Sequence, residues 1–348
     1  MKQRRLLPAI PVVAAALALG LAGCASPAPT PSPTAPVAST SEAAPSSSAP
    51  APKTFTIASA VIVSHPALQA VQDGFEEVLK EKGVNYTMIT KNAQGDPANA
   101  ATIASDFASD SKIDLILAIS TPIATAMASA IQDKPILFSA VTDPVAVGLV
   151  PSWTQAGKNI TGTSDLNPDA KPVSLVQEAM PNVKTIGVLY SSSEANSLTQ
   201  VTAYEAEAAP LGLTIKKQAI TSAAEITAGL AALKGVDAIL IPTDNTVVAS
   251  MATVIGFGQE NQIPVFCADT STVSLGTVAT RGLSYHDLGR ATGEMAVKVL
   301  VDGTPISSIT PEATTSTELI VNPDAAKAFG LTLSPDFIAK GTTVTTKS

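Results

Sequence analysis

Hydrophobic and polar positions follow two patterns along residues 54–348. Short continuous apolar runs, such as "TFTIASAVIV" at 54–63 and "IDLILAI" at 113–119, are typical of parallel strands buried on both faces. The stretches between them carry apolar residues at helical spacing, as in 66–83, which has Pro66 in its first turn and ends at Gly83. This alternation of strand and helix predicts an α/β fold with parallel sheets.

The same pattern occurs twice. "DLILAISTP" at 114–122 corresponds to "DAILIPTDN" at 237–245, and "KPILFSAVTDP" at 134–144 corresponds to "IPVFCADTSTV" at 263–273. We therefore predict two similar Rossmann-like lobes in tandem. Further strand-like and helical segments follow the second lobe, which suggests that the chain crosses between the lobes and forms a hinge. The predicted first lobe comprises residues 54–162 and about 284–313, and the second comprises 163–283 and about 314–348.

The first 53 residues have a different composition. A basic start, "MKQRR", precedes an apolar run at 6–21 and the small residues of "LAGC" at 21–24, which predicts a secretory signal peptide at 1–23. A membrane-spanning helix is disfavoured, because spanning takes about 20 apolar residues and this run contains two prolines. Residues 24–53 are rich in Pro, Ser and Ala, so we expect an extended tether rather than a folded segment.

Charge and cysteine content narrow the function classes. The formal net charge is -8, and loss of Lys2, Arg4 and Arg5 with the signal peptide would make it -11. An acidic chain without a basic cluster is a poor candidate for binding nucleic acid. The two cysteines are Cys24 and Cys267. If Cys24 is modified, Cys267 has no intramolecular partner, and stability must come from burial. We expect neither a cofactor nor a metal ion.

Polar residues follow the predicted strands. Ligands of open α/β sheets bind beyond the carboxyl ends of the strands, where helix N-termini attract anions. Hydroxyls can hold a carboxylate there, and an Asp can pair with an ammonium group. The combination predicts a zwitterionic ligand, an amino acid, although residues such as Ser120, Asn196 and Asn245 also suit helix N-caps. The candidate ligand-binding residues are Ser64, His65, Ser120, Thr121, Thr142, Asp143, Asp165, Glu194, Asn196, Ser197, Thr243, Asp244, Asn245 and Asp269.

Several motifs between about residues 57 and 329 resemble one family. They include "HPALQAVQDGFEEVL", "NAQGDPANAATIA", "DLILAISTPIATA", "AVTDPVAVGLV", "NITGTSDL", "GVLYSSSEANS", "PTDN" and "LGRATGEMAVKVL". Together they resemble the ABC-transporter substrate-binding lipoproteins of the tryptophan/tyrosine-binding type. The resemblance implies a type I periplasmic-binding fold, with two lobes joined by a three-segment hinge. It also implies an aromatic or other hydrophobic amino acid in the cleft, held by the candidate residues above, and an ABC permease with its ATPase as partners.

The resemblance extends to the amino-terminal cysteine and has two departures. "LAGC" resembles the bacterial lipobox, which implies cleavage before Cys24, acylation there with palmitate or a similar chain, and an extracytoplasmic protein anchored to the bacterial cell membrane. The family commonly has an acidic residue before its His–Pro pair, where this chain has Ser64, so ammonium pairing at that position is in question. "CAD" at 267–269 replaces smaller or hydroxyl residues, and Cys267 suits a small core position.

The sequence leaves two alternatives to a transport-binding protein. An enzyme is disfavoured, because His65 and His286 have no metal-binding spacing, and neither a G-x-S-x-G motif nor a Walker A motif is present. A pair between Cys267 and a histidine would need a thiol that ends a buried-looking strand. A lipid-anchored sensor or adhesin with the same fold is the other alternative. Tyr190, Tyr285 and Phe138 are candidates for contact with a ligand side chain, although each also suits the core.

Overall fold

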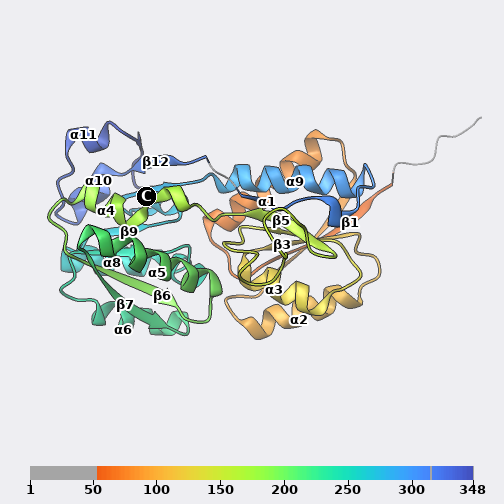
Figure 1. Ribbon diagram of the computed structural model, residues 1–348, viewed down its shortest axis with the longest axis horizontal. Helices are drawn as coiled ribbons and strands as arrows, with labels where there is room; N and C mark the ends of the chain where they lie inside the picture. The colour runs from red at the N-terminus through yellow and green to blue at the C-terminus, as the bar shows by residue number, and fades with distance from the viewer. Residues whose placement is uncertain (1–52, 314–315, 348) are drawn as a thin grey trace, which may run out of the picture. The chain divides into compact units, whose positions relative to one another are not determined.

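The computed structural model describes residues 53–313 and 316–347, so the predicted signal peptide, Cys24 and nearly all of the tether lie outside the described residues. The described chain belongs to one compact unit. It contains two lobes, each with its own parallel sheet and its own hydrophobic core (Figure 1). Within the described ranges, no helix has the length and apolar character needed to cross a membrane.

The sheet of the first lobe has six strands in the order β11-β5-β4-β3-β1-β2, all parallel to their neighbours. Every residue of β3 is buried, as expected of a central strand covered on both faces. β5 pairs in parallel with β4 on one side and with β11 on the other, so Ser164 at its end belongs to this sheet. The strands are β1 Phe55–Val61, β2 Tyr86–Asn92, β3 Leu115–Ile119, β4 Ile136–Ser139, β5 Ile160–Ser164 and β11 Glu312–Ala313.

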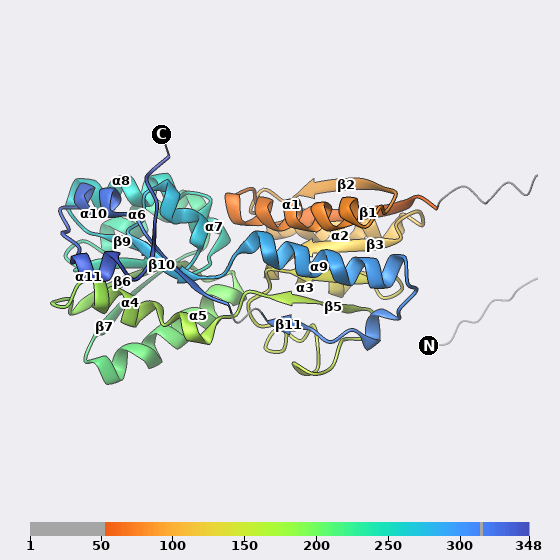
Figure 2. The same ribbon diagram turned by 90° about the horizontal axis from the view of Figure 1, so that it is seen from above.

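Helices cover both faces of the first sheet. α1 Pro66–Glu81 and α9 Tyr285–Leu300 lie together on one face, and α2 Pro97–Ser109 and α3 Thr121–Ala130 lie on the other (Figures 1 and 2). α1 and α9 approach closely because glycines face the partner helix. A Cβ atom added at Gly289 would lie 2.0 Å from the Val71 carbonyl oxygen, and one added at Gly74 would lie 2.1 Å from the His286 carbonyl oxygen.

The second lobe is built around a four-stranded parallel sheet in the order β7-β6-β8-β9. Its strands are β6 Thr185–Ser191, β7 Thr214–Ile220, β8 Ala238–Ile241 and β9 Val265–Cys267. A separate small sheet contains β10 Ala279–Gly282, β12 Glu318–Val321 and β13 Thr342–Thr343. The α-helices are α4 Pro172–Ala179, α5 Ala195–Ala208, α6 Ile226–Ala232, α7 Asn245–Val248, α8 Met251–Asn261, α10 Pro323–Ala328 and α11 Pro335–Ile338. Short 3₁₀ turns are η1 Pro168–Ala170, η2 Ala209–Leu211, η3 Ala223–Glu225, η4 Thr270–Leu275 and η5 Ile306–Ser308.

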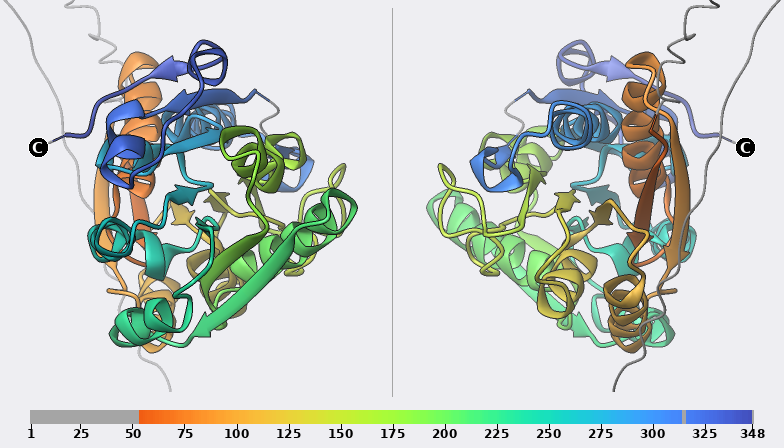
Figure 3. Two further views of the ribbon diagram at one scale, coloured as in Figure 1. Left: turned by 90° about the vertical axis from the view of Figure 1, so that its left-hand side faces the viewer. Right: turned by 90° about the vertical axis from the view of Figure 1, so that its right-hand side faces the viewer.

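The chain passes between the lobes three times. It crosses after β5, again between β10 and α9, and a third time between β11 and β12. As a result, α9 packs against α1 although more than two hundred residues separate them in sequence. The end views in Figure 3 show this late helix, in blue, beside the early helix, in orange. The residues that follow β5, β10 and β11 therefore lie near the boundary between the lobes.

Local details differ from the sequence pattern at one predicted helix. The helix expected from Asn245 onward is divided into α7 and α8, because the backbone at Ser250 leaves helical geometry with φ -112° and ψ 22°. The Asp244 carboxylate caps α7 by accepting a hydrogen bond from the Val247 amide, 2.9 Å away. Cys267 is a free thiol and is buried at the end of β9. Burial raises its pKa, so it remains an unreactive core residue.

Candidate ligand-binding site

A small polar cavity lies where the carboxyl ends of strands from both sheets meet. His65, Ala140 and Thr142 follow strands β1 and β4 of the first lobe, and Asp269 follows β9 of the second. The volume of the cavity is about 10 Å³. We call it the polar cavity, and its lining residues are His65, Leu68, Ala140, Thr142, Asp165, Asn196, Thr243, Asn245, Val248, Asp269 and Tyr285. Seven of the predicted site residues are thus brought together by the fold.

Three side-chain atoms of the polar cavity have no hydrogen-bond partner among the described residues, although they are buried. They are His65 Nδ1, Asp165 Oδ1 and Asn196 Oδ1. Leaving a buried polar group unpaired costs about 1–3 kcal/mol, and more for a charged group. Such atoms at one cavity are what a site for a polar ligand requires, because the ligand supplies the missing partners.

His65 joins the two lobes across the polar cavity. It precedes α1 in the first lobe, and its Nε2 lies 3.3 Å from Asn245 Oδ1 in the second. Its Nδ1 lies 3.8 Å from Asp269 Oδ2, which is within ion-pair range but too long for a hydrogen bond. Both side chains are nearly inaccessible, at 5% and 2% exposure. The second lobe therefore closes directly onto His65.

Asp165 lies on the segment where the chain first crosses between the lobes, and the pKa of its carboxyl group is raised. Burial raises the pKa of Asp165, and the negative charge of Asp269 acts in the same direction. The Tyr285 hydroxyl opposes this shift by donating a hydrogen bond to Asp165 Oδ2, at 3.1 Å. Two carboxylates that share a buried site with one histidine create a strong preference for a positively charged group.

Glu194, Ser197 and Asp244 mainly hold the second-lobe loops in place. Glu194 accepts hydrogen bonds from the backbone amides of Asn245 and Thr246, at 3.1 and 2.9 Å. Asp244 accepts from the Ser197 hydroxyl at 2.7 Å and from the Ser191 amide. Burial and the nearby Glu194 charge raise the pKa of Asp244 to about 7. None of the three lines the polar cavity, so their contacts point to a positioning role.

Four predicted residues of the first lobe lie outside the polar cavity. Ser64 is exposed and accepts a hydrogen bond from Asn92 Nδ2 at 2.7 Å, while Thr121 Oγ1 accepts from the Thr142 amide at 3.3 Å. Asp143 Oδ1 accepts from the amides of Val145 and Ala146, at 3.1 and 2.9 Å, and so caps a turn. Ser120 differs from these three residues, because its buried hydroxyl has no partner within the described chain.

Ser120 has an unusual backbone conformation at the start of α3. Its φ of 89° lies in a region that residues with a side chain rarely adopt, and its hydroxyl makes no capping bond to the helix. Ser120 ends β3, which lies between β4 and β1 in the sheet, and the residues that follow those two strands line the polar cavity. Strain of this kind at a strand end is often found where backbone groups meet a ligand.

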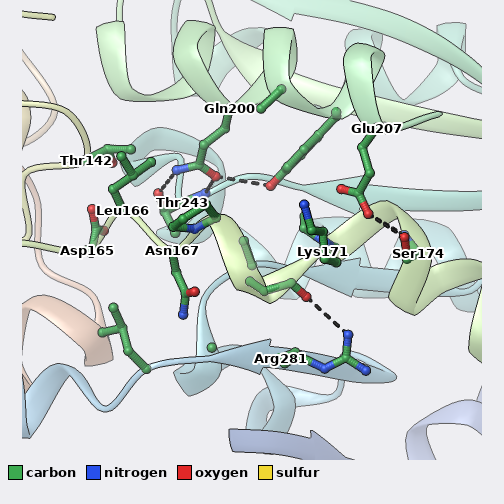
Figure 4. A pocket seen from close by; sticks show the side chains of 18 of the residues that line it. Thr142, Asp165, Leu166, Asn167, Lys171, Ser174, Gln200, Glu207, Thr243 and Arg281 are labelled. Atoms are coloured by element: carbon green, nitrogen blue, oxygen red, sulfur yellow. Dashed lines mark hydrogen bonds between the residues drawn. The ribbon is translucent and has the colours of Figure 1, made fainter. Parts of the chain in front are cut away.

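A larger groove adjoins the polar cavity and runs into the second lobe. It has a volume of about 610 Å³ and shares Thr142, Asp165, Thr243 and Tyr285 with the polar cavity. Figure 4 shows Asp165 at one end of this groove and Ser174 and Glu207 at the other. We call it the side groove. Much of its wall is apolar and comes from Leu166, Pro168, Ala203, Tyr204, Pro210, Leu211 and Leu283.

Apart from the four residues shared with the polar cavity, the sequence pattern did not identify the residues of the side groove. Gln200 and Tyr204 are four residues apart on α5, a spacing that also predicts a core-facing helix surface. Gln200 accepts hydrogen bonds from the Tyr204 hydroxyl at 3.1 Å and the Thr243 amide at 3.0 Å. Of the three aromatic candidates, Tyr285 lines both cavities, whereas Phe138 is fully buried and Tyr190 lines neither. His286 is bonded to Glu77 on the surface.

Comparison with known proteins gives the chain a family. Residues 56–345 match the family model described as ABC transporter substrate binding protein. The chain is 38% identical to a tyrosine-binding protein of Clostridioides difficile over 284 residues, which is 80% of this chain and 82% of that protein. The structure also matches an ABC domain in complex with L-Trp from Streptococcus pneumonia. That match has a TM-score of 0.80 and 34% identity, over 84% of this chain and all of the other.

A third comparison concerns the conformation of the lobes. A ligand-free, open substrate-binding protein with adhesive properties from Clostridium difficile is 41% identical over the same 84% of this chain and all of that chain, yet its TM-score is only 0.62. Because the more similar sequence gives the poorer superposition, the lobes here resemble the L-Trp-bound arrangement more than the open one.

The matches confirm three predictions made from the sequence. They confirm the type I periplasmic-binding fold and the resemblance to tryptophan- and tyrosine-binding relatives. The relatives are binding proteins, which also confirms the preference for a binding protein over an enzyme. This chain belongs to the family of ABC transporter substrate-binding proteins.

Proposed function

We propose that this protein captures an aromatic amino acid between its lobes and delivers it to an ABC permease and its ATPase. Members of this family are extracytoplasmic components of transporters. One relative is named for tyrosine binding, and the structure of another contains L-Trp. These names support an aromatic amino acid as the ligand class, and the chemistry of the polar cavity independently supports an amino acid.

The observation that carries the proposal is that buried acceptors and a buried hydroxyl donor, none of them with a hydrogen-bond partner among the described residues, occur at the strand ends around one cavity. Asp165 Oδ1 and Asn196 Oδ1 are buried acceptors without a partner among the described residues, and they suit an ammonium group. Ser120 has a buried hydroxyl without such a partner and precedes the ten-residue helix α3, so it suits a carboxylate. A zwitterionic amino acid supplies both charges at once.

Binding would be coupled to closure of the lobes. The acceptors come from the crossing segment and the second lobe, while Ser120 belongs to the first lobe. A ligand that contacts both lobes stabilises the closed arrangement, because the open one offers only half of these contacts. The contacts of His65 with Asn245 and Asp269 would form in the same step.

We further propose that the protein is held at the bacterial cell membrane by lipid on Cys24. The support is the signal-like segment, the "LAGC" sequence and the Pro-rich composition of residues 25–53. A polyproline-rich chain spans about 3.1 Å per residue, so a tether of this length would let the folded lobes reach a permease in the same membrane. Lipid anchoring and delivery follow from the sequence and from family membership.

Calorimetric titration with the twenty amino acids tests the ligand class. We expect tyrosine, tryptophan or phenylalanine to bind with a dissociation constant in the micromolar range or below, about -8 kcal/mol or better. Acidic and basic amino acids should bind far more weakly. N-acetylated and amidated forms of the best ligand serve as controls, because each removes one of the two charges. Tight binding of a sugar or nucleoside, with no response to aromatic amino acids, would contradict the proposal.

A further inference from the structure

The side groove continues from the part of the polar cavity that would hold the ammonium group. Asp165 and Thr243 line both spaces, so a ligand whose amine meets Asp165 has the groove directly in front of its side chain. The walls of the groove include the Leu166 side chain, the buried Tyr204 ring and Leu283. A volume of about 610 Å³ falls within the range of small-molecule sites and exceeds what an aromatic ring needs.

Most polar groups of the side groove already have partners in the protein. Glu207 accepts hydrogen bonds from the Ser174 amide and hydroxyl, at 2.8 and 2.7 Å. Arg281 forms an ion pair with Glu178 at 3.2 Å. Gln200 is bonded to Tyr204 and Thr243, and Lys171 is exposed, so water can satisfy its amine. These groups therefore have little need of a ligand.

Besides Asp165, the exception is Asn167. Its side-chain Nδ2 is buried, lines the side groove and has no hydrogen-bond partner among the described residues. Nδ2 carries two N–H donors, so it requires an acceptor. Asn167 follows Asp165 by two residues, and two residues of extended chain span about 6.6 Å. This spacing is comparable to the distance between the amine and the phenolic oxygen of tyrosine. Figure 4 shows Asp165 and Asn167 following one another along the groove.

We propose that the side groove binds the ligand's aromatic ring and that Asn167 donates a hydrogen bond to a hydroxyl on that ring. This inference rests on the proposed function and names a narrower ligand class, the hydroxylated aromatic amino acids. A phenolic oxygen can accept from Nδ2, whereas the phenyl ring of phenylalanine offers no acceptor to it. Asn167 is then a specificity-determining residue, which acts on the choice among aromatic ligands.

The test compares two ligands that differ by one hydroxyl. Tyrosine and phenylalanine are titrated calorimetrically into the wild-type chain, Asn167→Ala and Asn167→Leu, the second of which keeps the side-chain volume and removes the donor. We expect wild type to bind tyrosine about tenfold more tightly than phenylalanine, as expected for one hydrogen bond. In both variants the ratio should fall to within about twofold of unity, while phenylalanine affinity changes little, which shows that the site is intact. Asn85→Ala, at an exposed position on the first lobe, is the matched control and should keep the wild-type ratio.

Each result has a definite meaning. A tyrosine-to-phenylalanine ratio near one in wild type, or a ratio that survives both Asn167 substitutions, overturns the inference but leaves the proposed function standing. If wild type binds none of tyrosine, phenylalanine and tryptophan, the proposed function fails and this inference fails with it. Loss of phenylalanine binding in Asn167→Ala and Asn167→Leu would also overturn it, because Asn167 would then support the whole site rather than read the hydroxyl.

Discussion

At the scale of single residues, two aspartates have different environments. Asp143 looks like an ammonium partner in sequence, but it accepts bonds from the Val145 and Ala146 amides and lines neither cavity. Asp165 lines both cavities and keeps Oδ1 free of any partner within the described chain. The sequence pattern placed Asp143 after a strand and Asp165 in the connection between the lobes, and it made both of them ligand candidates. It could not distinguish them, because the distinction depends on which backbone amides come within reach after folding.

This difference predicts unequal effects on ligand binding. Asp165→Asn removes the charge that would pair with the ammonium group and should weaken binding by about 1.5–3 kcal/mol. Burial raises the pKa of Asp165, and the ligand needs its ionised form, so wild-type affinity should fall as pH is lowered through that raised pKa. Calorimetry over a range of pH checks both effects. Asp143→Asn is the matched control, because an amide oxygen can still cap the turn, and its affinity should stay within about twofold of wild type. Equal losses in the two variants would contradict this assignment.

At the scale of elements, the helix pair α1 and α9 joins sequence-distant parts of the first lobe through glycine contacts. The added Cβ of Gly289→Ala would meet the Val71 carbonyl oxygen at 2.0 Å, so the two helices would have to separate. Overpacking of this kind costs about 1–3 kcal/mol. We expect the free energy of unfolding, measured by urea denaturation, to fall by that amount.

Gly256 offers a control for the helix propensity of alanine. It lies within α8, and an added Cβ would have no neighbour within 4 Å. Gly256→Ala should therefore raise the free energy of unfolding by up to about 1 kcal/mol, since alanine favours the helix more than glycine does. If both substitutions stabilise the protein, the close approach of α1 and α9 does not matter for stability.

The sequence pattern located the strands that are buried on both faces, and it was less successful where the structure depends on local backbone geometry or on a groove. Continuous apolar runs located β3 and β4, because each is covered on both faces. The division of the predicted helix after Asn245 was missed, because it depends on the local backbone at Ser250. The groove-lining positions of α5 were missed as well. Gln200 and Tyr204 have the spacing of an ordinary core-facing surface, and only the fold shows that a groove lies in front of them.

At the scale of the whole molecule, the three crossings turn two similar lobes into a clamp with one polar cavity. The repeat of "DLILAISTP" and "DAILIPTDN" predicted that polar turns of both lobes would follow equivalent strands. The fold then places Asn196, Thr243 and Asn245 of the second lobe opposite His65 and Thr142 of the first. The repeat could not predict the relative rotation of the lobes, which fixes the partners of each polar turn. Glu194 and Asp244 were therefore predicted to contact the ligand, whereas the structure shows them hydrogen-bonded to other residues of the second lobe.

Membrane attachment is a separate property of the whole molecule and should be separable from binding. If lipid on Cys24 anchors the protein, Cys24→Ala should move it from the membrane fraction to the soluble fraction, because residues 53–313 and 316–347 contain no helix able to span a membrane. Ligand affinity should not change, since the polar cavity and the side groove use residues 65–285 only. Fractionation of cells that express each form, with calorimetry on the soluble domain, measures both properties. Uptake of the ligand should fall in cells that carry Cys24→Ala, because a released protein no longer stays near the permease.

The matched control is Cys267→Ala, which removes the buried thiol and should leave the protein in the membrane fraction. Retention of Cys24→Ala in the membrane fraction would mean that an uncleaved amino-terminal segment, rather than a lipid, holds the protein there.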